Sequence, residues 1–394
     1  MKVIGVIGNE ACDADSIVSA LVYAQFMNCS APGDTQYIPF VQCSISDLSD
    51  RLDFVKVCEI VDLDSASLGL RSVLDYATEP PVHSWILIDH HSPSHIMQAS
   101  VSEPTVVEII DHHEVGSETA KSFVSTVPSV DIRVIGSCCS IIAERVLGSV
   151  CRDMVSHPHL FMLLLVIVLD TGNFNPATQK ATPTDITVCD TLGGILNIPA
   201  SLGSYHEQLV QAKFNPKFWY HSPVTKLFNY DYKLVHPQVG YAVILRSLDA
   251  IADEDIVCFR DENQLRVFVV ASGFFLPAGI IKRQLLITAT DPEHLKRITA
   301  DLHEVTNVQT VSVTDNVSKF EVFDESFSRK RFAPNFLQFL AKLSVISKSY
   351  PRCTPGLTRS SMTQKNGRET DPGRDHENRG VAAVSGRRDG KNRP

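Results

Sequence analysis

Short apolar runs alternate with segments of helical periodicity over the first half of the chain. The runs at 2–8, 85–88, 106–110 and 132–136 are rich in Val and Ile, as buried strands are. In 15–26, by contrast, the apolar residues recur with the spacing of a helix that buries one face. Strands that alternate with helices predict an α/β fold with a doubly wound, mostly parallel sheet.

Three further helices are expected after the last of these strands. Residues 137–147 follow it directly and have helical spacing, and Thr182 before Pro183 is typical of an N-cap and a first helical turn. The longest apolar run, 160–169, has ten residues, whereas a membrane-spanning helix needs about 20. We therefore expect 160–169 to be a buried helix.

The pattern changes after about residue 197, where aromatic residues gather and strand-like runs become frequent. We expect a first domain at 1–205 and a smaller α+β domain at 216–348. The remainder, 349–394, is rich in Gly, Arg, Asp and Asn, which predicts a disordered tail. In the second domain we expect strands at 241–247, 265–272 and 283–290, and helices at 291–305 and 334–346.

The composition, with 44% hydrophobic residues and a formal charge of −9, is that of a soluble globular protein. The negative charge lies outside the tail, because 352–394 holds ten Lys or Arg against five Asp or Glu. An acidic body gives no indication of nucleic-acid or membrane partners, and we expect a monomer. Ten scattered cysteines without a CxxC pair, and an N-terminus without the pattern of a signal peptide, favour a cytoplasmic location.

Acidic residues follow three of the predicted strands. Asp13 and Asp15 come after the first strand, Asp89 after the second, and Asp111 after the third, where it precedes two histidines. Ligands of open α/β sheets bind outside the carboxyl ends of the strands, so these side chains are expected to converge. Asp170, at the end of the buried helix, is a fourth candidate.

Each of these acidic positions also has an ordinary structural interpretation. An Asp-x-Asp pair after a strand is often only a turn or a helix cap. Several such positions in one domain favour a metal site, because carboxylates bind hard divalent ions and imidazole adds tolerance for Mn²⁺ or Co²⁺. Two bridged ions would lower the pKa of a shared water and produce a hydroxide that attacks phosphorus.

Four motifs of the first part of the chain resemble those of a known family. "NEACDADS", "ILIDHH", "IIDHHEV" and "IVLDTGNF" resemble, in this order, the four motifs of the DHH phosphoesterase superfamily. "SFSRKRF" at 326–332 resembles the signature of the C-terminal domain that accompanies them in family II pyrophosphatases, prune and yeast-type exopolyphosphatases. The first motif is most similar to that of the yeast and kinetoplastid exopolyphosphatases. The resemblance implies an active site in the cleft between the two domains.

The resemblance also implies a ligand set for two divalent ions, Mg²⁺ or Mn²⁺, with Co²⁺ as a further candidate. The ligands would be Asp13, Asp15, Asp89, His112 and Asp170, and Asp89 and Asp170 would bridge the ions and take part in catalysis. Asp111 would act from behind by orienting His112. Asn9 stands where the pyrophosphatases have His. An amide oxygen is a weaker donor than imidazole, which leaves the role of Asn9 as a ligand open and favours easier use of Mg²⁺.

Substrate contacts follow from the same resemblance. His113 would face the phosphate under attack as a donor or an acid, and Arg329 and Lys330 would bind the phosphate chain. His90 and Lys213 are further candidates, although His90 could equally pack in the interior and Lys213 lie on the surface.

The function expected from these residues is hydrolysis of the terminal phosphoanhydride bond of linear inorganic polyphosphate, with release of orthophosphate. Inorganic pyrophosphatase and a prune-like phosphodiesterase remain alternatives. A catalytically weak scaffold that binds partners is the alternative from outside the enzymes.

Overall fold

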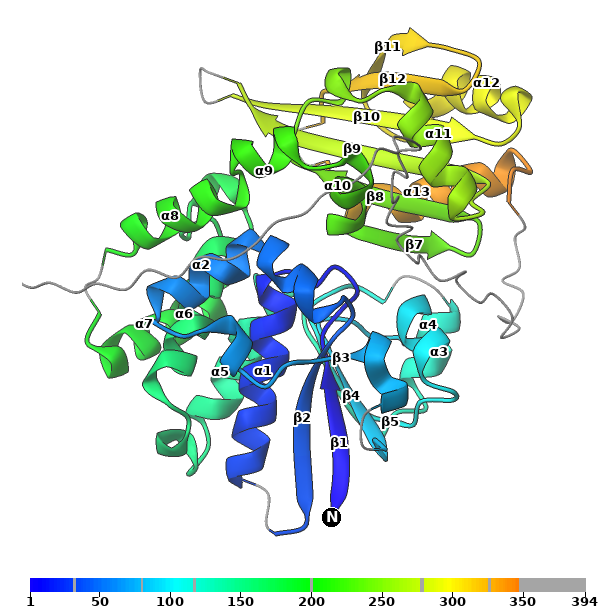
Figure 1. Cartoon of the computed structure of the whole chain (residues 1–394). Coiled ribbons are helices and arrows are strands. Elements are labelled where there is room, and N and C mark those ends of the chain that lie inside the picture. The colour runs from blue at the N-terminus through cyan, green and yellow to red at the C-terminus, as the bar shows by residue number, and fades with distance from the viewer. Residues whose placement is uncertain are drawn as a thin grey trace, which may run out of the picture. The chain divides into compact units, whose positions relative to one another are not determined.

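The computed structural model describes residues 1–30, 33–78, 81–115, 118–198, 201–276, 280–324 and 327–346 (Figure 1). The side chains of Thr78 and Lys330 also lie outside the described set. The chain divides into a compact unit at Met1–Pro355 and a second at Gly356–Pro394. The tail predicted at 349–394 lies outside the described residues.

A parallel sheet forms the centre of the first part of the chain. Its strands are β1 (Lys2–Ile7), β2 (Thr35–Val41), β3 (Arg71–Ser72), β4 (Ser84–Ile88), β5 (Val106–Asp111) and β6 (Ser129–Ile132). Within the described residues, these six strands are ordered β3-β2-β1-β4-β5-β6, and every neighbouring pair is parallel. The chain therefore moves outward on one side of β1 and then on the other, so that the order reverses between β1 and β4. Ligands of doubly wound sheets bind at this reversal.

Helices cover both faces of this sheet, as a doubly wound fold requires (Figure 1). They are α1 (Ala14–Ser30), α2 (Leu52–Ile60), α3 (His95–Ser100), α4 (Glu118–Val124), α5 (Cys138–Leu147), α6 (His157–Asp170), α7 (Pro183–Leu196) and α8 (Gly203–Lys213). Apolar side chains of α1, α5 and α6 form one buried cluster with Ile86 and Ile110 of the sheet. On the opposite face, Phe40 and Trp85 pack with Met97 of α3.

The helix α6 confirms the prediction of a buried helix at 160–169. Residues 162–169 are buried without interruption, so this helix contacts protein on all sides. Neither α6 nor any other helix in the described ranges has both the length and the apolar character needed to cross a bilayer. Thr182 caps α7 and Asp185 completes the reciprocal capping box, as Thr182 and Pro183 predict.

A second, mixed sheet follows. Its strands are β7 (Tyr232–His236), β8 (Val239–Ile244), β9 (Val267–Phe275), β10 (Ile281–Ala289), β11 (Val308–Val313) and β12 (Val317–Val322). The helices of this part are α9 (Pro216–His221), α10 (Val224–Tyr230), α11 (Asp253–Glu262), α12 (Pro292–Asp301) and α13 (Arg329–Lys342). In the described residues the order is β11-β12-β10-β9-β8-β7, and only β8 and β9 are parallel.

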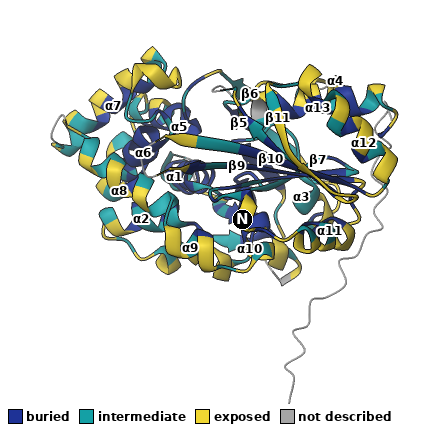
Figure 2. Ribbon diagram, turned by 90° about the horizontal axis from the view of Figure 1, so that it is seen from above, coloured by how far each residue is buried: buried dark blue, intermediate teal, exposed yellow. Residues whose placement is uncertain are grey.

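Both faces of the second sheet are covered, which makes its central strands the most buried (Figure 2). Side chains of α12 and α13 pack on one face, and those of α10 and α11 pack on the other. The predicted α/β class, with a parallel sheet followed by an α+β part, is therefore confirmed.

Two predicted elements are displaced from their observed positions. The strand expected at 132–136 is β6 at Ser129–Ile132, and Val134 is 77% exposed. The strand β6 is at the edge of the sheet, where an apolar run does not mark the bounds of a buried strand. The last helix begins at Arg329 instead of 334, because Ser328 supplies an extended N-cap and Pro334 lies inside the helix. Arg329 and Lys330 are thus the first residues of α13 and not part of a loop.

Candidate metal and phosphate site

The turn between β1 and α1 brings two acidic side chains to the carboxyl edge of the sheet. A Cβ at Gly8 would lie 2.7 Å from the carbonyl oxygen of Ser16, so only glycine allows the strand end to approach α1 this closely. Cys12 has a left-handed backbone, with φ of 50°. Asp13 Oδ1 accepts a hydrogen bond of 3.1 Å from the Ser16 amide, so Asp13 does cap α1.

Asp15 is held by the N-terminus of α5. Its two oxygens accept hydrogen bonds from the Cys138 and Cys139 amides, at 2.9 and 2.8 Å, and from the Ser137 hydroxyl at 2.8 Å. Burial alone would raise the pKa of Asp15, but the charge of His112 and these hydrogen-bond donors lower it. Asp15 is therefore an ionised carboxylate in a fixed orientation. Its Oδ2 lies 3.7 Å from His112 Nε2.

Asp89 lies directly after β4 at the centre of the site. It is 2% exposed and has a φ of 63°, a strained conformation for a residue with a side chain. Its Oδ1 lies 3.2 Å from His112 Nε2 and 3.4 Å from His113 Nδ1. One ligand atom from each of these three residues lies within 4.8 Å of the others, close enough to bind one ion.

Asn9 contacts Asp89 across the reversal in strand order. Its Nδ2 donates a hydrogen bond of 2.6 Å to Asp89 Oδ2, and its Oδ1 accepts one of 2.8 Å from the Ala11 amide. The amide group thus positions the Asp89 carboxylate. Its oxygen accepts from the backbone, and whether Asn9 also binds a metal stays a prediction.

Asp111, at the end of β5, orients imidazole rings from behind. Its Oδ1 accepts from His113 Nδ1 at 2.7 Å and from the His112 amide at 2.7 Å, and Oδ2 accepts from His91 Nδ1 at 2.6 Å. Burial would raise the pKa of Asp111, but these donors hold it far below its usual range. The expectation that Asp111 orients His112 is corrected, because His112 Nδ1 binds the Ile135 carbonyl at 3.0 Å. The rings that Asp111 holds are those of His113 and His91.

Asp170 completes the acidic cluster as the last residue of α6. Its Oδ2 is buried and has no hydrogen-bond partner among the described residues. Burial, followed by the negative charges of Asp15 and Asp13, raises the pKa of Asp170. Burial and neighbouring carboxylates likewise raise the pKa of Asp89 to about 7.

These carboxylates fit a divalent cation. A buried acid without a partner costs free energy that a bound cation removes. The donors that meet here are carboxylates with one or two imidazoles, a set suited to Mg²⁺ or Mn²⁺. Asp13 and Asp15 also have local structural roles, and their part in metal binding stays a prediction.

Lys213 and Arg329, two cationic residues expected to bind phosphate, are held by acidic partners. Lys213 Nζ lies 3.4 Å from Asp53, and the negative charges of Asp53, Asp13 and Asp170 outweigh burial and raise its pKa. Lys213 therefore lies within the electrostatic reach of the acidic cluster. Arg329 Nη1 lies 2.7 Å from Asp231 Oδ1. The side chain of Lys330 lies outside the described residues.

His90 and His91 differ in their environments. His90 Nδ1 binds the Ile88 carbonyl at 2.8 Å, its Nε2 is buried without a hydrogen-bond partner in the described part of the chain, and burial lowers its pKa to about 4. Sequence reasoning missed His91, which binds Asp111. The repeated Asp-His-His order at 89–91 and 111–113 was the signal that could have indicated it.

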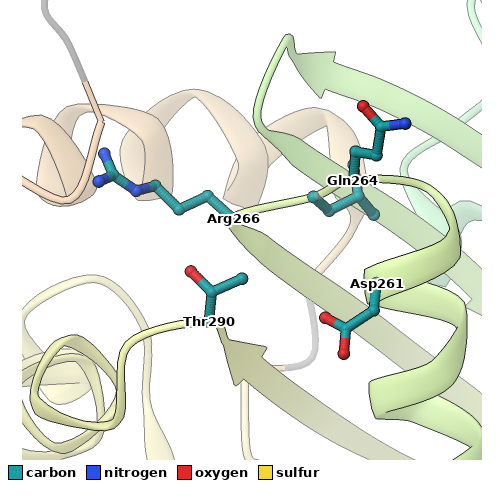
Figure 3. Close-up of a pocket in the computed structure, with 5 residues that line it drawn as sticks. Asp261, Gln264, Arg266 and Thr290 are labelled. Atoms are coloured by element: carbon teal, nitrogen blue, oxygen red, sulfur yellow. The ribbon is translucent and has the colours of Figure 1, made fainter.

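One surface hollow of the described part lies away from these residues. A hollow of about 330 Å³ on the second part of the chain is lined by Asp261, Gln264, Leu265, Arg266 and Thr290 (Figure 3). Arg266 Nη1 donates a hydrogen bond of 2.9 Å to the Val345 carbonyl, so this side chain has a structural partner. The candidate site is defined by its converging donors.

The sequence of the chain is similar to known proteins in this region. Residues 3–169 match the DHH family, N-terminal domain. Exopolyphosphatase PRUNE1 of Homo sapiens is 26% identical over 294 residues, which cover 72% of this chain and 62% of the human protein. PRUNE1 of Mus musculus is 25% identical over 350 residues, which cover 84% of this chain and 73% of the mouse protein. The matched part thus spans less than two thirds of the human relative.

The fold is also similar to that of a solved structure. A protein of Methanococcus jannaschii assigned to the family II inorganic pyrophosphatases superposes with a TM-score of 0.52 at 18% identity. The superposition covers 83% of this chain and 96% of that protein, so both parts of the chain share its fold.

Proposed function

Residues 3–169 of this chain belong to the DHH family, and on that premise we propose that the protein is a metal-dependent exopolyphosphatase. It would hydrolyse the terminal phosphoanhydride bond of linear inorganic polyphosphate and release orthophosphate. The observation that carries this proposal is the buried cluster of Asp15, Asp89, His112 and Asp170 at the reversal in strand order. Similarity to proteins named exopolyphosphatase supports the choice of substrate.

The chemistry needs two divalent ions, for which Asp13, Asp15, Asp89, His112 and Asp170 are the proposed ligands. Such ions lower the pKa of a bound water and offset the charge of phosphate oxygens. The chain's own residues prepare the site. Asn9 holds Asp89 through a hydrogen bond of 2.6 Å, and the α5 amides hold Asp15 at 2.8 and 2.9 Å.

His113 is the proposed acid for the leaving phosphate. Its Nδ1 lies 2.7 Å from the buried, ionised Asp111. A carboxylate at this distance favours the protonated imidazole, which can donate its proton to the departing oxygen. Asp111 is thus a positioning residue, and His91 holds its second oxygen at 2.6 Å.

The proposed phosphate contacts are Lys213, Arg329, Lys330 and His90. Lys213 has the strongest support, since the charges of Asp13 and Asp170 both act on it. Arg329 would exchange the Asp231 carboxylate, to which Nη1 donates at 2.7 Å, for a phosphate oxygen. A cytoplasmic location and a monomeric state are also part of the proposal.

A substrate panel tests the proposal. Orthophosphate release should be fastest from long-chain polyphosphate, then from tripolyphosphate, with Mg²⁺ or Mn²⁺ present, and gels should show gradual shortening of the chains from their ends. The variant Asp89→Asn, which removes the shared ligand, should lose nearly all release. Faster hydrolysis of pyrophosphate or of a cyclic nucleotide would replace the substrate but keep the metal site. No hydrolysis of any of them would favour a binding protein.

A further inference from the structure

Two buried thiols meet beside the candidate metal site. Cys12, in the turn after β1, is 1% exposed, and Cys43, just after β2, is 8% exposed. The two thiols interact electrostatically, because each shifts the pKa of the other. The strands β1 and β2 are paired in parallel, with Ile7 opposite Phe40, so the turns that follow them lie side by side.

Backbone contacts fix the two thiols in register. The amide of Gln42, the residue before Cys43, donates to Cys12 Sγ at 3.2 Å. The Gln42 side chain donates to the Gly8 carbonyl at 2.7 Å, and the Ser72 hydroxyl donates to the Cys43 carbonyl at 2.8 Å. These contacts hold the two turns that carry Cys12 and Cys43 side by side.

A buried cation adjoins the pair. Arg51 is 5% exposed, and its charge acts on both Cys12 and Cys43. The interaction with Cys12, followed by the positive charge of Arg51, outweighs burial and lowers the pKa of Cys43. A thiolate beside an arginine is the nucleophilic form that oxidants attack. In contrast, burial and the charge of Asp15 raise the pKa of Cys138 and Cys139, which are inert by this criterion.

We propose that Cys12 and Cys43 form a reversible disulfide on exposure to hydrogen peroxide, and that this bond weakens the metal site. The Cys43 sulfur attacks one peroxide oxygen, the O–O bond breaks, and water leaves, which gives a sulfenic acid on Cys43. The Cys12 sulfur then attacks the Cys43 sulfur, and the S–O bond breaks with release of a second water. Two thiols lose two electrons and two protons, and the peroxide is reduced to two waters.

The consequence for the metal site follows from the position of Cys12. A disulfide brings the sulfur atoms to about 2.05 Å and fixes both side chains in the geometry of the bond, which acts on the turns that carry them. Cys12 also donates its S–H to the Asn9 carbonyl, at 3.5 Å, and the disulfide removes this donor. Because Asn9 holds Asp89 and Asp13 follows Cys12, movement of this turn displaces two of the proposed ligand positions. This half of the proposal rests on the metal site proposed above.

Peptide mapping tests the bond itself without reference to activity. The full-length protein is treated with hydrogen peroxide, alkylated and digested with chymotrypsin, whose cleavage after Tyr23, Phe26 and Phe40 separates Cys12, Cys29 and Cys43. A linked pair of peptides carrying Cys12 and Cys43, which dithiothreitol separates, is expected. The absence of this pair, or preferential linkage of other cysteines, would overturn the proposal.

Manganese binding tests the consequence. Oxidation should weaken Mn²⁺ binding, measured by titration calorimetry, by at least about tenfold, as loss of a positioning contact does in other metal sites. By linkage, bound Mn²⁺ should lower the equilibrium fraction of the disulfide in a thiol–disulfide redox buffer. Unchanged Mn²⁺ affinity in the cross-linked protein would refute the coupling. Neither measurement uses polyphosphate, so an incorrect substrate assignment cannot be confused with failure here.

Matched variants complete the design. Cys43→Ser, with Cys43→Ala as a second choice if the first fails to fold, should keep its basal Mn²⁺ affinity and lose its response to peroxide. Cys189→Ser removes another buried thiol, in α7, whose pKa burial raises to about 12, and this variant should respond like the wild type. An equal peroxide response in all three proteins would sink the proposal.

Discussion

At the scale of single residues, the candidate site combines buried carboxylates with the hydrogen-bond donors that offset their negative charge. Asp15 and Asp111 are each supplied with several donors, whereas Asp89 and Asp170 each have one buried oxygen without a hydrogen bond in the described residues. Hydrogen bonds from the protein thus stabilise Asp15 and Asp111, whereas a bound cation would stabilise Asp89 and Asp170.

The first prediction concerns metal-free stability. The raised pKa of Asp89, about 7, means that its neutral form stabilises the fold, and this stabilisation is lost as pH rises from about 4 to about 7. Asp89→Asn mimics the neutral form. In EDTA the variant and the wild type should melt alike near pH 4.5, and the variant should melt at least about 2 °C higher at pH 8.

Comparison of the two proteins cancels the opposing effect of His90, whose lowered pKa favours folding as pH rises. Mn²⁺ should reverse the order at pH 8, because only the wild type has the carboxylate ligand. Identical melting curves of the two proteins at both pH values, measured by calorimetry, would show that ionisation of Asp89 does not destabilise the folded protein.

The second prediction concerns Asn9. Replacement by His would exchange a hydrogen-bond donor to Asp89 for a nitrogen ligand. Asn9→His should shift the ratio of kcat/KM values towards pyrophosphate over polyphosphate, and towards Mn²⁺ over Mg²⁺. Asn9→Ala, which removes the donor without adding a ligand, should lower activity with both ions and leave the ratios unchanged. Constant ratios in Asn9→His would contradict a role for this position in selectivity.

At the scale of elements, the site depends on how closely strand ends approach helix starts. The turn after β1 passes over Ser16 of α1, and the N-terminus of α5 reaches Asp15 with two amides. The helix termini thus supply the donors that keep the carboxylates ionised. Small changes in these turns should act on the metal site directly.

Gly8→Ala tests this dependence. The new Cβ would lie 2.7 Å from both the carbonyl and the hydroxyl oxygen of Ser16. We expect a loss of about 1–3 kcal/mol in unfolding free energy, typical of overpacking, together with weaker Mn²⁺ binding. Denaturant unfolding and Mn²⁺ titration measure the two effects.

Gly193→Ala is the matched control, since a Cβ there meets nothing within 4 Å and the position is inside α7. It should stabilise the protein by about 0.5–1 kcal/mol and leave Mn²⁺ binding unchanged. If Gly8→Ala behaved like Gly193→Ala, the proposed tight approach would be wrong.

At the scale of the whole molecule, charged groups connect the first sheet and its helices to the second. Lys226 of α10 lies 2.8 Å from Asp50, and Arg51 lies 4.9 Å from the centroid of the Tyr230 ring. These contacts join the segment after β2 to α10, whose C-cap is Asp231, the partner of Arg329. Substrate binding at Arg329 is therefore expected to act on the same junction.

Arg329→Ala should lower kcat/KM for polyphosphate by about 10- to 100-fold, because a charge-assisted hydrogen bond to phosphate is lost. The loss should fall mainly on KM, since Arg329 is proposed to bind the chain and not the reacting phosphate. Lys296→Ala removes an exposed cation of α12 and should leave both constants unchanged. Equal effects of the two variants on steady-state kinetics would exclude a specific contact at Arg329.

The sequence alone determined the class of fold and the residue types of the site. Runs such as 85–88 and the helix at 160–169 are recognisable because burial on all sides requires continuous apolar residues. Acids directly after strands were predicted to converge because parallel strands end at one edge. The sequence does not predict the strands β2, β11 and β12, because their short runs mix apolar and polar residues and depend on pairing with neighbouring strands as well as on packing.

Only the tertiary structure decided which partner each site residue has. The sequence gives no distance between Asp111 and His91, 20 residues apart, or between Cys12 and Cys43, and it could not show that Ile135 orients His112. Such partners depend on strand order and register, which are set by the packing of the whole sheet. Residue types follow from local chemistry, whereas contacts follow from the fold that brings distant strand ends together.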